Sequence, residues 1–548
     1  MKSTLLIHPS DNVLVALKDL KAGEEAEARG ETIKLIQDIP AKHKIAIRAL
    51  QAGDSILMYG TLVGTAQTAI PAGGAITTSN VKHAATPYGK KQKEYHWAAP
   101  DVAAWKQRTF MGYHRADGQV GIRNYWLVIP LVFCENRNIL TLKEAFLNEL
   151  GYGQPDLFRE QVRLLRDAYL KDAQIAPSRI TLPTQKSALQ TSRTFEHVDG
   201  IKFLTHESGC GESDDDSANL CALLAGYCVN PNVGGVTVLS LGCQKAQIEK
   251  FKEALFQKDP RFSKPLFIFE QQKMKTEVEL LSAAVKSTFE GLIQINQLRR
   301  SPAPLSALSV GVKCGGSDGF SGISANPAIG HTADLVAALG GRVLIAEFPE
   351  LCGMEQELID RAVDEATGER FAMLMTEYAE RARAIGANFD MNPSPGNIKD
   401  GLITDAMKSA GAAKKAGTSP VTAAVGYGQY ATKSGLNLVC TPGNDVLATT
   451  GMGGAGATVQ LFTTGLGTPT GNPISPMVKI STNTTLATKM PDIIDIDAGP
   501  IIAGEKSVEE VGEQVLEYII GLANGEYDTK AMQLGQDDFM FWKRGVSL

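Results

Sequence analysis

The hydrophobic pattern of the chain changes near residue 109. Before it, short β-rich apolar runs at residues 5–9, 32–39, 43–50 and 55–60 are separated by the turn signals "KAGEE", "QAGDS" and "PAGG". Helical periodicity is poor there, so residues 1–85 are predicted to form a compact β domain. Residues 86–108 are polar, with scattered aromatic residues and no clear period, which indicates a linker or tethering arm.

After residue 109, apolar runs of five to eight residues alternate with helix-like segments. Each run is continuous rather than alternating, which is typical of parallel strands covered on both faces. The expected strands are "WLVIPLVF", "IKFLT", "VTVLSL", "LFIFE", "LSVGV", "RVLIAEF", "LNLVC", "TVQLF" and "MVKIS". We predict an α/β protein with a central domain at 109–300 and a doubly wound parallel sheet at 301–548.

Two of the segments between the strands have clear amphipathic helical patterns. One is "MEQELIDRAVDEAT" at 354–367, and the other is "TDAMKSAGAAKKAG" at 404–417. In the second, Thr404 is the expected N-cap and Gly417 the expected C-cap.

Charge and composition exclude several classes of protein. The net charge of −6 and the lack of a basic run longer than "KKQK" argue against a nucleic-acid partner. No segment approaches 18 uncharged apolar residues, and the first apolar run is interrupted by polar side chains, so no membrane span or signal segment is expected. The eight cysteines form no CxxC pair, and we expect free thiols in a cytoplasmic protein.

Reactive side chains recur where the predicted strands end. In parallel sheets ligands bind beyond the carboxyl ends of the strands, so these residues predict an assembled site. They are Cys134, His206, Cys210, Cys243, Cys314, Glu347, Glu350, Cys440, Asn444 and Asp445. Burial in a core is the commoner fate of a cysteine, and the spacing of Cys221 and Cys228 on one helix face indicates a structural role for both.

The stretch "KCGGSDGFSGISANPAIG" at 313–330 carries five glycines directly after a predicted strand. Glycines let backbone amides approach a bound anion, and a helix that opens after such a loop adds its positive dipole. The alternative is a tight turn that needs glycine only for its dihedral angles. A second glycine motif, "GMGGAG" at 451–456, is not read as a dinucleotide site, because a helical stretch precedes it and a strand follows.

Several of these motifs together resemble the altronate and galactarate dehydratase family of sugar-acid dehydratases. They are "IHPSDNVLVAL", "IPAKHKIAI", "HRADGQVGIRN", "SGC", "LGC", "KCGGSDGFSGISANPAIG", "NPSPGN", "KAGTS", "PGND" and "IDAG", which span nearly the whole chain in order. "GIRN", "EFPELCGMEQ" and "TPGND" resemble the altronate pattern more than the galactarate one. Leu466 and Thr470 stand where the family has Arg and Tyr, and a segment at about 155–200 is inserted.

The resemblance implies an N-terminal β-clip domain of the SAF type, a central domain that dimerises, and a C-terminal Rossmann-like domain. It also implies loss of water from a 2,3-dihydroxy acid to give a 2-keto-3-deoxy acid, with dependence on iron. Removal of a proton next to a carboxylate needs a base and a cation that holds the developing enediolate. D-altronate is the expected substrate, with galactarate, another sugar acid or a sulfolactate-type acid as alternatives.

The resemblance and the strand ends together suggest roles for particular residues. Iron, as Fe²⁺ or as a cluster with one open iron, with Mn²⁺ as an alternative ion, would be held by Cys134, Cys210 and Cys243, with Cys314 as a substitute. His43 and His8 are the candidate bases, and both could instead be structural. Asp318 is a further candidate catalytic residue, which would meet the substrate hydroxyls or the outer shell of the metal. Substrate contacts are assigned to Arg123, Asn124, Gly315, Gly316, Ser317, Asn326, Asn444 and Asp445.

Two rival functions are compatible with the same sequence. A sugar-acid binding protein would use the same glycine loops and hold no metal, so metal content distinguishes it from an enzyme. A lyase that acts on a different 2-hydroxy acid is distinguished by a substrate screen.

Overall fold

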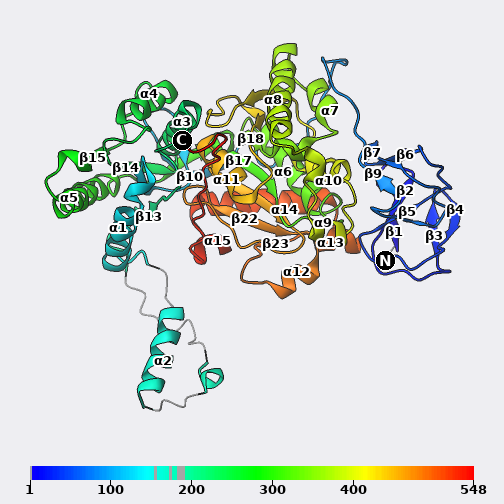
Figure 1. Cartoon of the computed structure of the whole chain (residues 1–548), viewed down its shortest axis with the longest axis horizontal. Helices are drawn as coiled ribbons and strands as arrows, with labels where there is room; N and C mark the ends of the chain where they lie inside the picture. The colour runs from blue at the N-terminus through cyan, green and yellow to red at the C-terminus, as the bar shows by residue number, and fades with distance from the viewer. Residues whose placement is uncertain (1–2, 154–156, 172–175, 182–191) are drawn as a thin grey trace.

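The computed structural model describes residues 3–153, 157–171, 176–181 and 192–548. The chain forms three domains in a row, with the N-terminal domain at one end, the central domain at the other and the C-terminal domain between them (Figure 1). Within the inserted segment at 155–200, residues 155–156, 172–175 and 182–191 lie outside the described residues. No described helix combines the length and the apolar character that a membrane crossing requires.

The N-terminal domain consists of small antiparallel sheets, as its short apolar runs predict. One sheet has the order β1-β2-β5-β8, a second has the order β6-β7-β9, and β3 pairs with β4. The strands are Thr4–Leu5 (β1), Val13–Ala16 (β2), Glu25–Ala28 (β3), Glu31–Lys34 (β4), Lys44–Ala46 (β5), Ser55–Met58 (β6), Thr61–Ala66 (β7), Ala75–Ile76 (β8) and Val81–Lys82 (β9).

The central domain is built on a parallel sheet with the order β13-β12-β14-β15. All residues of β12 and β14 are buried, which explains why their sequences are continuously apolar. Its strands are Tyr125–Pro130 (β12), Gly200–Phe203 (β13), Val233–Ser240 (β14) and Leu266–Glu270 (β15). Its helices are Asn136–Glu149 (α1), Leu157–Lys171 (α2), Asp214–Val229 (α3), Ile248–Lys258 (α4) and Glu277–Ile295 (α5).

The C-terminal domain contains a seven-stranded parallel sheet with the order β19-β20-β18-β17-β21-β22-β23. The chain starts at β17 in the middle and winds outward in both directions, with α6 packed against β17, β18, β20 and β21. The strands are Ser309–Cys314 (β17), Arg342–Ile345 (β18), Val421–Val425 (β19), Gly435–Val439 (β20), Val459–Thr464 (β21), Met477–Ser481 (β22) and Ile496–Asp497 (β23).

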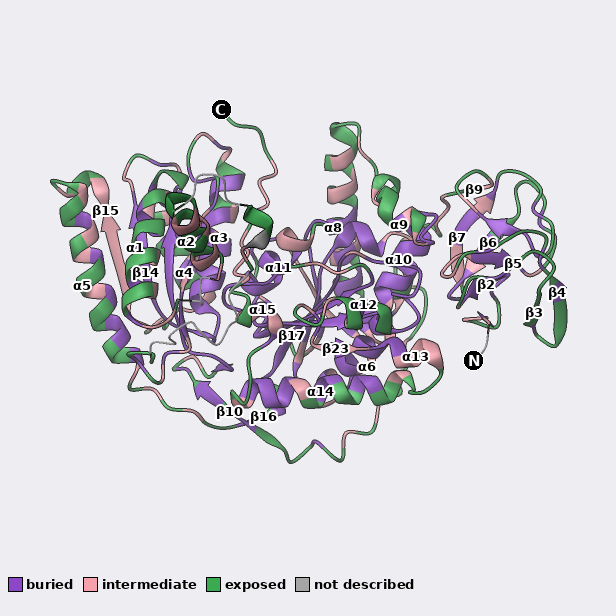
Figure 2. Cartoon of the chain, turned by 90° about the horizontal axis from the view of Figure 1, so that it is seen from below, coloured by how far each residue is buried: buried purple, intermediate pink, exposed green. Residues whose placement is uncertain are grey.

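The helices of this domain are Ala325–Ala338 (α6), Glu355–Asp360 (α7), Glu365–Ala384 (α8), Pro395–Lys399 (α9), Asp405–Ala413 (α10), Asp445–Gly454 (α11), Thr484–Lys489 (α12), Gly499–Ala503 (α13), Val508–Asn524 (α14) and Lys530–Gln533 (α15). Buried residues fill the strands of both parallel sheets, whereas β15 and α5 at the edge of the molecule are more exposed (Figure 2).

A third, antiparallel sheet joins the central and C-terminal domains. It has the order β11-β10-β16, from Thr109–His114 (β10), Val120–Gly121 (β11) and Ser301–Pro304 (β16). β16 enters the C-terminal domain while pairing with β10, and α14 packs against β10. The two larger domains are therefore connected by backbone pairing.

The predicted linker at 86–108 follows the surface of the C-terminal domain. Tyr95 donates a hydrogen bond to the carbonyl oxygen of Thr418, and the Trp97 indole donates to the Thr418 hydroxyl. Further along, Trp105 and Arg108 both bind Glu517 on α14. These hydrogen bonds hold residues 86–108 against the surface of the C-terminal domain.

The structure confirms every strand expected after residue 109 and changes one helix. The segment predicted as one helix at 354–367 forms α7 and the start of α8. The break occurs because the Val363 amide pairs with the carbonyl of Val421, and the Asp364 side chain caps α8 by accepting from the Thr367 amide. Thr404 caps α10 as predicted, and Gly417, with a φ of 63°, ends the turn after it. The "GMGGAG" stretch forms the end of α11 and the turn after it, and the strand β21 follows as predicted.

Candidate active site

The reactive residues at the strand ends fall into two groups, because the strands belong to two sheets. Cys134, Cys210 and Cys243 follow β12, β13 and β14 of the central domain. Cys314 ends β17, and Asp445 follows β20, both in the C-terminal domain. Cys314 thus lies at the end of another sheet from the three cysteines for which it was the expected substitute.

Glycines hold two of the three cysteine loops close to their neighbours. Gly209, before Cys210, has a φ of 101°, and a Cβ there would lie 2.2 Å from the carbonyl oxygen of Leu131. Gly242, before Cys243, has a φ of 122°, and a Cβ would lie 2.6 Å from Oε1 of Gln272. A side chain at either position would push the loop away. The "SGC" and "LGC" motifs therefore have a local structural reason.

The three thiols are exposed and close enough to affect one another. Partial burial raises the pKa of the Cys134 thiol, and the nearby Cys210 and Cys243 thiols raise it further. Two buried carboxylates accompany them: Glu135 and Glu212 each have one oxygen without a hydrogen-bond partner. A cation would relieve both the repulsion between thiolates and the unpaired oxygens.

The spacing of these sulfurs bears on what they could hold. Among the described residues, two groups of three potential ligands have ligand atoms within 4.8 Å of one another, and the three cysteines are not one of them. Two thiolates bound to a single ion at about 2.3 Å can be at most about 4.6 Å apart. The sulfurs would have to turn inward to share one ion, whereas a cluster of several irons spans more distance.

The end of β17 carries a buried network of lysines and carboxylates. The Lys313 ammonium contacts Glu347 and lies 2.8 Å from Asp445, and Lys415 lies 3.0 Å from the second oxygen of Glu347. Lys408 lies 2.8 Å from Glu350. Glu347 has a φ of 71°, a strained conformation for a residue with a side chain.

The network shifts the pKa values of its members. Burial alone would lower the pKa of Lys313, but Glu347, Asp445 and Glu350 outweigh it and hold that pKa well above its usual value. Burial would raise the pKa of Glu350, but the lysines, Lys408 first, lower it to about 2. Cys314 lies inside this network, 3.2 Å from the Lys415 ammonium, and burial raises the pKa of its thiol.

The glycine loop after β17 has two free backbone amides. Gly315 allows the Asp445 carboxylate to approach, since a Cβ there would lie 2.5 Å from its Oδ1. Gly316 has a φ of 56°, and its carbonyl accepts from the amides of Gly465 and Leu466. Within the described residues, the amides of Gly316 and Ser317 donate no hydrogen bond. Adjacent free amides next to a left-handed residue form an anion-binding nest.

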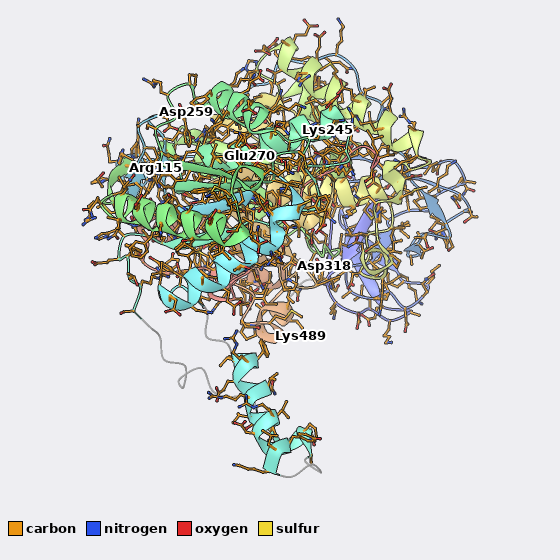
Figure 3. The ribbon with its side chains drawn as sticks, turned by 60° about the vertical axis from the view of Figure 1, so that its left-hand side comes forward. Arg115, Lys245, Asp259, Glu270, Asp318 and Lys489 are labelled. Atoms are coloured by element: carbon orange, nitrogen blue, oxygen red, sulfur yellow. The ribbon has the colours of Figure 1, made fainter. Side chains whose placement is uncertain are left out.

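Asp318 ties this loop to the N-terminal domain. Its carboxylate is fully buried and accepts from the Ser321 and Thr482 hydroxyls. It also pairs with the Lys42 ammonium at 3.0 Å, and Lys42 reaches Asp400 at the same distance. Asp318 lies where the N-terminal domain meets the C-terminal domain (Figure 3). Its carboxylate has protein partners rather than the open position expected for contact with a substrate hydroxyl.

The two candidate histidines differ in position. His43 Nε2 lies 3.0 Å from the carbonyl oxygen of Lys399. A carbonyl only accepts, so Nε2 carries the proton and Nδ1 keeps the lone pair. Burial lowers the pKa of His43. His8, by contrast, binds Ser10 and Asp11 in its own exposed turn.

Two asparagines of the predicted site have local structural roles. Asn326 donates to the carbonyl of Gly411 and accepts from the Thr463 hydroxyl, deep in the interior. Asn444 caps α11 by accepting from the Leu447 amide. Both hold the site's framework in place.

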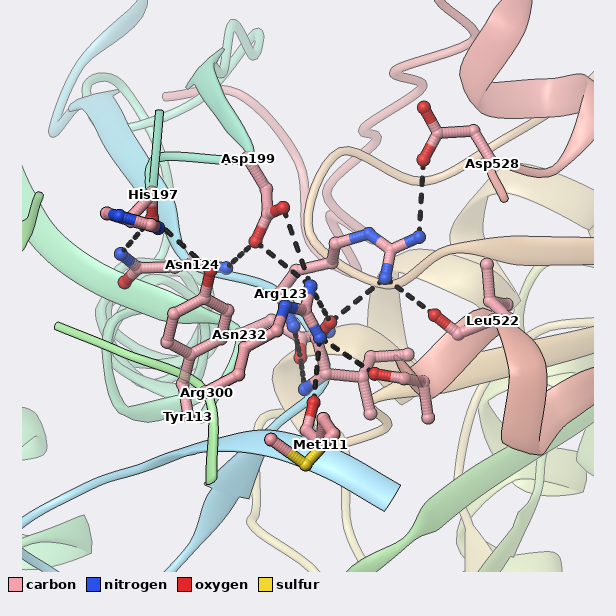
Figure 4. Close-up of polar contacts among 12 residues, drawn as sticks. Met111, Tyr113, Arg123, Asn124, His197, Asp199, Asn232, Arg300, Leu522 and Asp528 are labelled. Atoms are coloured by element: carbon pink, nitrogen blue, oxygen red, sulfur yellow. Dashed lines mark hydrogen bonds and ion pairs between the residues drawn. The ribbon is translucent and has the colours of Figure 1, made fainter. Parts of the chain in front are cut away.

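Arg123 and Asn124 lie at the opposite end of β12 from Cys134, because "GIRN" precedes the strand. Six strand residues span about 20 Å. Arg123 donates to the carbonyls of Leu522 and Tyr527 and pairs with Asp528 (Figure 4). Asn124 accepts from Arg115. This placement differs from the expectation that they hold the substrate, since Arg123 joins the two larger domains and Asn124 binds residues of the central domain.

The C-terminal tail connects the two strand-end regions, which the sequence did not suggest. Trp542 stacks on Tyr378 of α8, and the Arg544 amide donates to Asp216 at the start of α3. The last residue, Leu548, donates its amide to the carbonyl of Gly211, next to Cys210. The network of Lys313, Lys408 and Lys415 was not predicted either. Lysines within apolar segments are the sequence signal that could have indicated it.

Comparison with known proteins assigns the chain to a family. Residues 2–84 match the altronate/galactarate dehydratase SAF domain, 112–296 match the D-galactarate dehydratase/altronate hydrolase second domain, and 305–547 match the D-galactarate/altronate dehydratase C-terminal domain. Altronate dehydratase of Bacillus subtilis is 34% identical over 96% of both chains. The chain belongs to the altronate/galactarate dehydratase family.

Other members of the family are equally distant. Altronate dehydratase of Escherichia coli is 34% identical over 99% of both chains. Galactarate dehydratase (L-threo-forming) of the same organism is 32% identical over 96% of this chain and 94% of its own. The chain is therefore a hydro-lyase that dehydrates a sugar acid, as predicted, and identities this similar do not distinguish between substrates.

Proposed function

We propose that this dehydratase acts on D-altronate and forms 2-dehydro-3-deoxy-D-gluconate and water. The observation that carries the proposed site is the pair of free amides at Gly316 and Ser317, beside the docked domain that bears His43. The altronate-like stretches "GIRN", "EFPELCGMEQ" and "TPGND" support the choice of substrate.

The substrate carboxylate would bind at the glycine loop. The two amides supply donors, and the positively charged Lys313 and Lys415 lie behind the loop at the end of β17. A carboxylate bound in this way loses part of its negative charge to the amides, which makes removal of the neighbouring proton easier. Asp318 and Lys42 position the loop against the N-terminal domain.

His43 would remove the proton next to the carboxylate. The Lys399 carbonyl orients its ring and leaves the lone pair on Nδ1. Because burial lowers the pKa of His43, the ring is neutral and able to accept a proton near pH 7. The lysine network is a poor source of a base, since its carboxylates keep Lys313 charged.

The exposed thiols of Cys134, Cys210 and Cys243 would hold the iron. Soft thiolates suit iron, and the separation of the sulfurs favours a cluster over a single ion. Bound iron with an open position would supply a Lewis acid for the departing 3-hydroxyl. The eight cysteines are free thiols, which suits a cytoplasmic enzyme.

A homodimer through the central domain is part of the proposal. Helix α5 exposes Val278, Val285, Phe289 and Ile293 along one side, next to the edge strand β15. A second copy of the chain would cover this face. The variant Val278→Glu/Ile293→Glu should then be monomeric in light scattering, while an unchanged mass would reject this face.

The proposed function is tested by a substrate screen. Protein purified without oxygen and loaded with iron is incubated with D-altronate, galactarate and other aldonic and aldaric acids, and 2-keto acid is measured. We expect the highest kcat/KM with D-altronate. A higher kcat/KM with galactarate would transfer the assignment to that acid, and absence of keto acid from every sugar acid would reject the proposed function.

A further inference from the structure

A second group of potential metal ligands lies between the N-terminal and C-terminal domains. His83 directly follows β9, Cys352 lies in the turn before α7, and Asp405 is the first residue of α10. One ligand atom of each lies within 4.8 Å of the other two. Three segments far apart in the sequence thus bring an imidazole, a thiol and a carboxylate to one point.

The carboxylate of Asp405 is buried without a partner. Its exposed fraction is 1%, and neither of its oxygens has a hydrogen-bond donor. The Cys352 thiol is its neighbour and is only a weak donor. Burying a charged group with no partner is costly, so this carboxylate requires a cation or a proton.

The surroundings distinguish this group from the one at Cys314, Glu347 and Glu350. There, lysines already neutralise the carboxylates. Around Cys352 the neighbouring charges are negative, from Glu355, Asp405 and Asp390.

The cation that acts on Asp405, Lys408, is already bound to other groups. Its ammonium is bound to Glu350 and Asn392, at 2.8 and 2.5 Å. The local charge balance around Asp405 therefore favours a bound cation.

His83 presents a lone pair toward the same place. Its Nδ1 accepts a hydrogen bond from the Ala406 amide in the first turn of α10, at a long 3.3 Å. An ion would take this lone pair instead. A Cβ built on Gly353, next to Cys352, would lie 3.4 Å from the Cβ of Ala85, so the two domains are in van der Waals range here.

We infer that His83, Cys352 and Asp405 bind a divalent transition-metal ion of the zinc and iron(II) class. Nitrogen, sulfur and oxygen ligands of this kind suit such an ion, and a fourth position is left for water. Since His83 comes from the N-terminal domain and the other two from the C-terminal domain, the ion ties the two domains together. The site is separate from Cys134, Cys210 and Cys243.

The test uses Co²⁺ as a spectroscopic probe. In the full-length variant Cys134→Ser/Cys210→Ser/Cys243→Ser, the exposed thiols no longer contribute. Titration of the metal-free variant with Co²⁺ should give a thiolate-to-cobalt charge-transfer band that saturates at one equivalent. Absence of the band would overturn the inference.

Further substitutions in this background identify the thiol. Cys352→Ser should abolish the band, and His83→Gln should weaken Co²⁺ binding at least about 10-fold, as loss of a metal-site group does. Cys440→Ser, at a buried cysteine of the same domain, is the control and should leave the band unchanged. A band that survives Cys352→Ser and disappears with Cys314→Ser would place the ion in the lysine network instead.

Hydrogen exchange reports on the tie between domains. Amides at 81–85 and 404–407 should exchange more slowly with Zn²⁺ bound than after chelation, and this difference should vanish in His83→Gln. Equal exchange with and without Zn²⁺ in the unsubstituted protein would show that no ion links the domains.

Discussion

The carboxyl ends of the two parallel sheets carry similar residue types in different environments. In the central domain the strands end in exposed thiols, two of them on loops that require glycine, beside carboxylates that each have one oxygen without a partner. In the C-terminal domain they end in a buried network in which each carboxylate has a lysine. An incomplete, exposed donor set is suited to take up a metal, whereas a neutralised and buried set is suited to hold a loop and its charge in place.

The largest expected effect comes from the exposed thiols. Cys210→Ser should reduce bound iron and turnover to background, because a neutral hydroxyl is a poor replacement for a thiolate ligand. Cys314→Ser is the matched substitution at the other sheet and should retain iron. Metal analysis of both proteins after anaerobic loading makes the measurement. Equal iron in the two variants would remove the distinction between the sheets.

A slightly smaller loss is expected at the proposed base. His43→Ala should lower kcat by about 10²- to 10⁴-fold with the substrate Kd largely unchanged. His8→Ala is the control and should have a small effect, since His8 contacts its own turn. Comparable losses in both variants would show that the N-terminal domain, rather than the His43 ring, is what the reaction needs.

The same assignment predicts a pH profile. Burial lowers the pKa of His43, so the neutral base is fully present above that pKa and is lost as the pH falls through it. The group contributes less to stability at acidic pH, since the unfolded chain takes up the proton more readily. Turnover should therefore decline on the acid side below the usual histidine pKa of about 6.5. A decline centred above that value would contradict a buried base.

An intermediate effect is expected where the two domains meet. Asp318→Asn removes the partner of Lys42, so the N-terminal domain should dock less firmly and kcat should fall by about 10- to 100-fold, the range of a supporting residue. Lys42→Met should have a similar effect, and the double variant should be no worse than either single one. Fully additive losses, or unchanged kinetics in Asp318→Asn, would remove this pair from the account.

The smallest effect concerns the choice of sugar acid. Leu466 lies against Gly316, at the position where the resemblance of the sequence to the family leads us to expect Arg. Leu466→Arg places a second cation beside the free amides and should lower the KM for dicarboxylic sugar acids about 10-fold or less. Leu466→Met is the control for size. Equal KM values in the two variants would show that this residue does not face the substrate.

The strands could be predicted from sequence, but their grouping could not. Buried parallel strands such as β14 must be apolar on both faces, and this leaves a continuous local signal. Which strands share a sheet depends on long-range pairing, so Cys314 was placed with cysteines of another sheet. Arg123 lies apart from the other candidate residues because its motif precedes β12. The partners of Lys313 lie 34 and 132 residues away, and no local pattern reports them.

X-ray absorption of the iron-loaded protein, kept without oxygen, tests the central claim most directly. Each of the two compact groups with a cysteine, at Cys314 and at Cys352, can offer one sulfur to a metal, whereas Cys134, Cys210 and Cys243 offer three. The account predicts at least three sulfur neighbours for the iron that is lost in the triple serine variant. Iron surrounded by oxygen and nitrogen with one sulfur or none would contradict it.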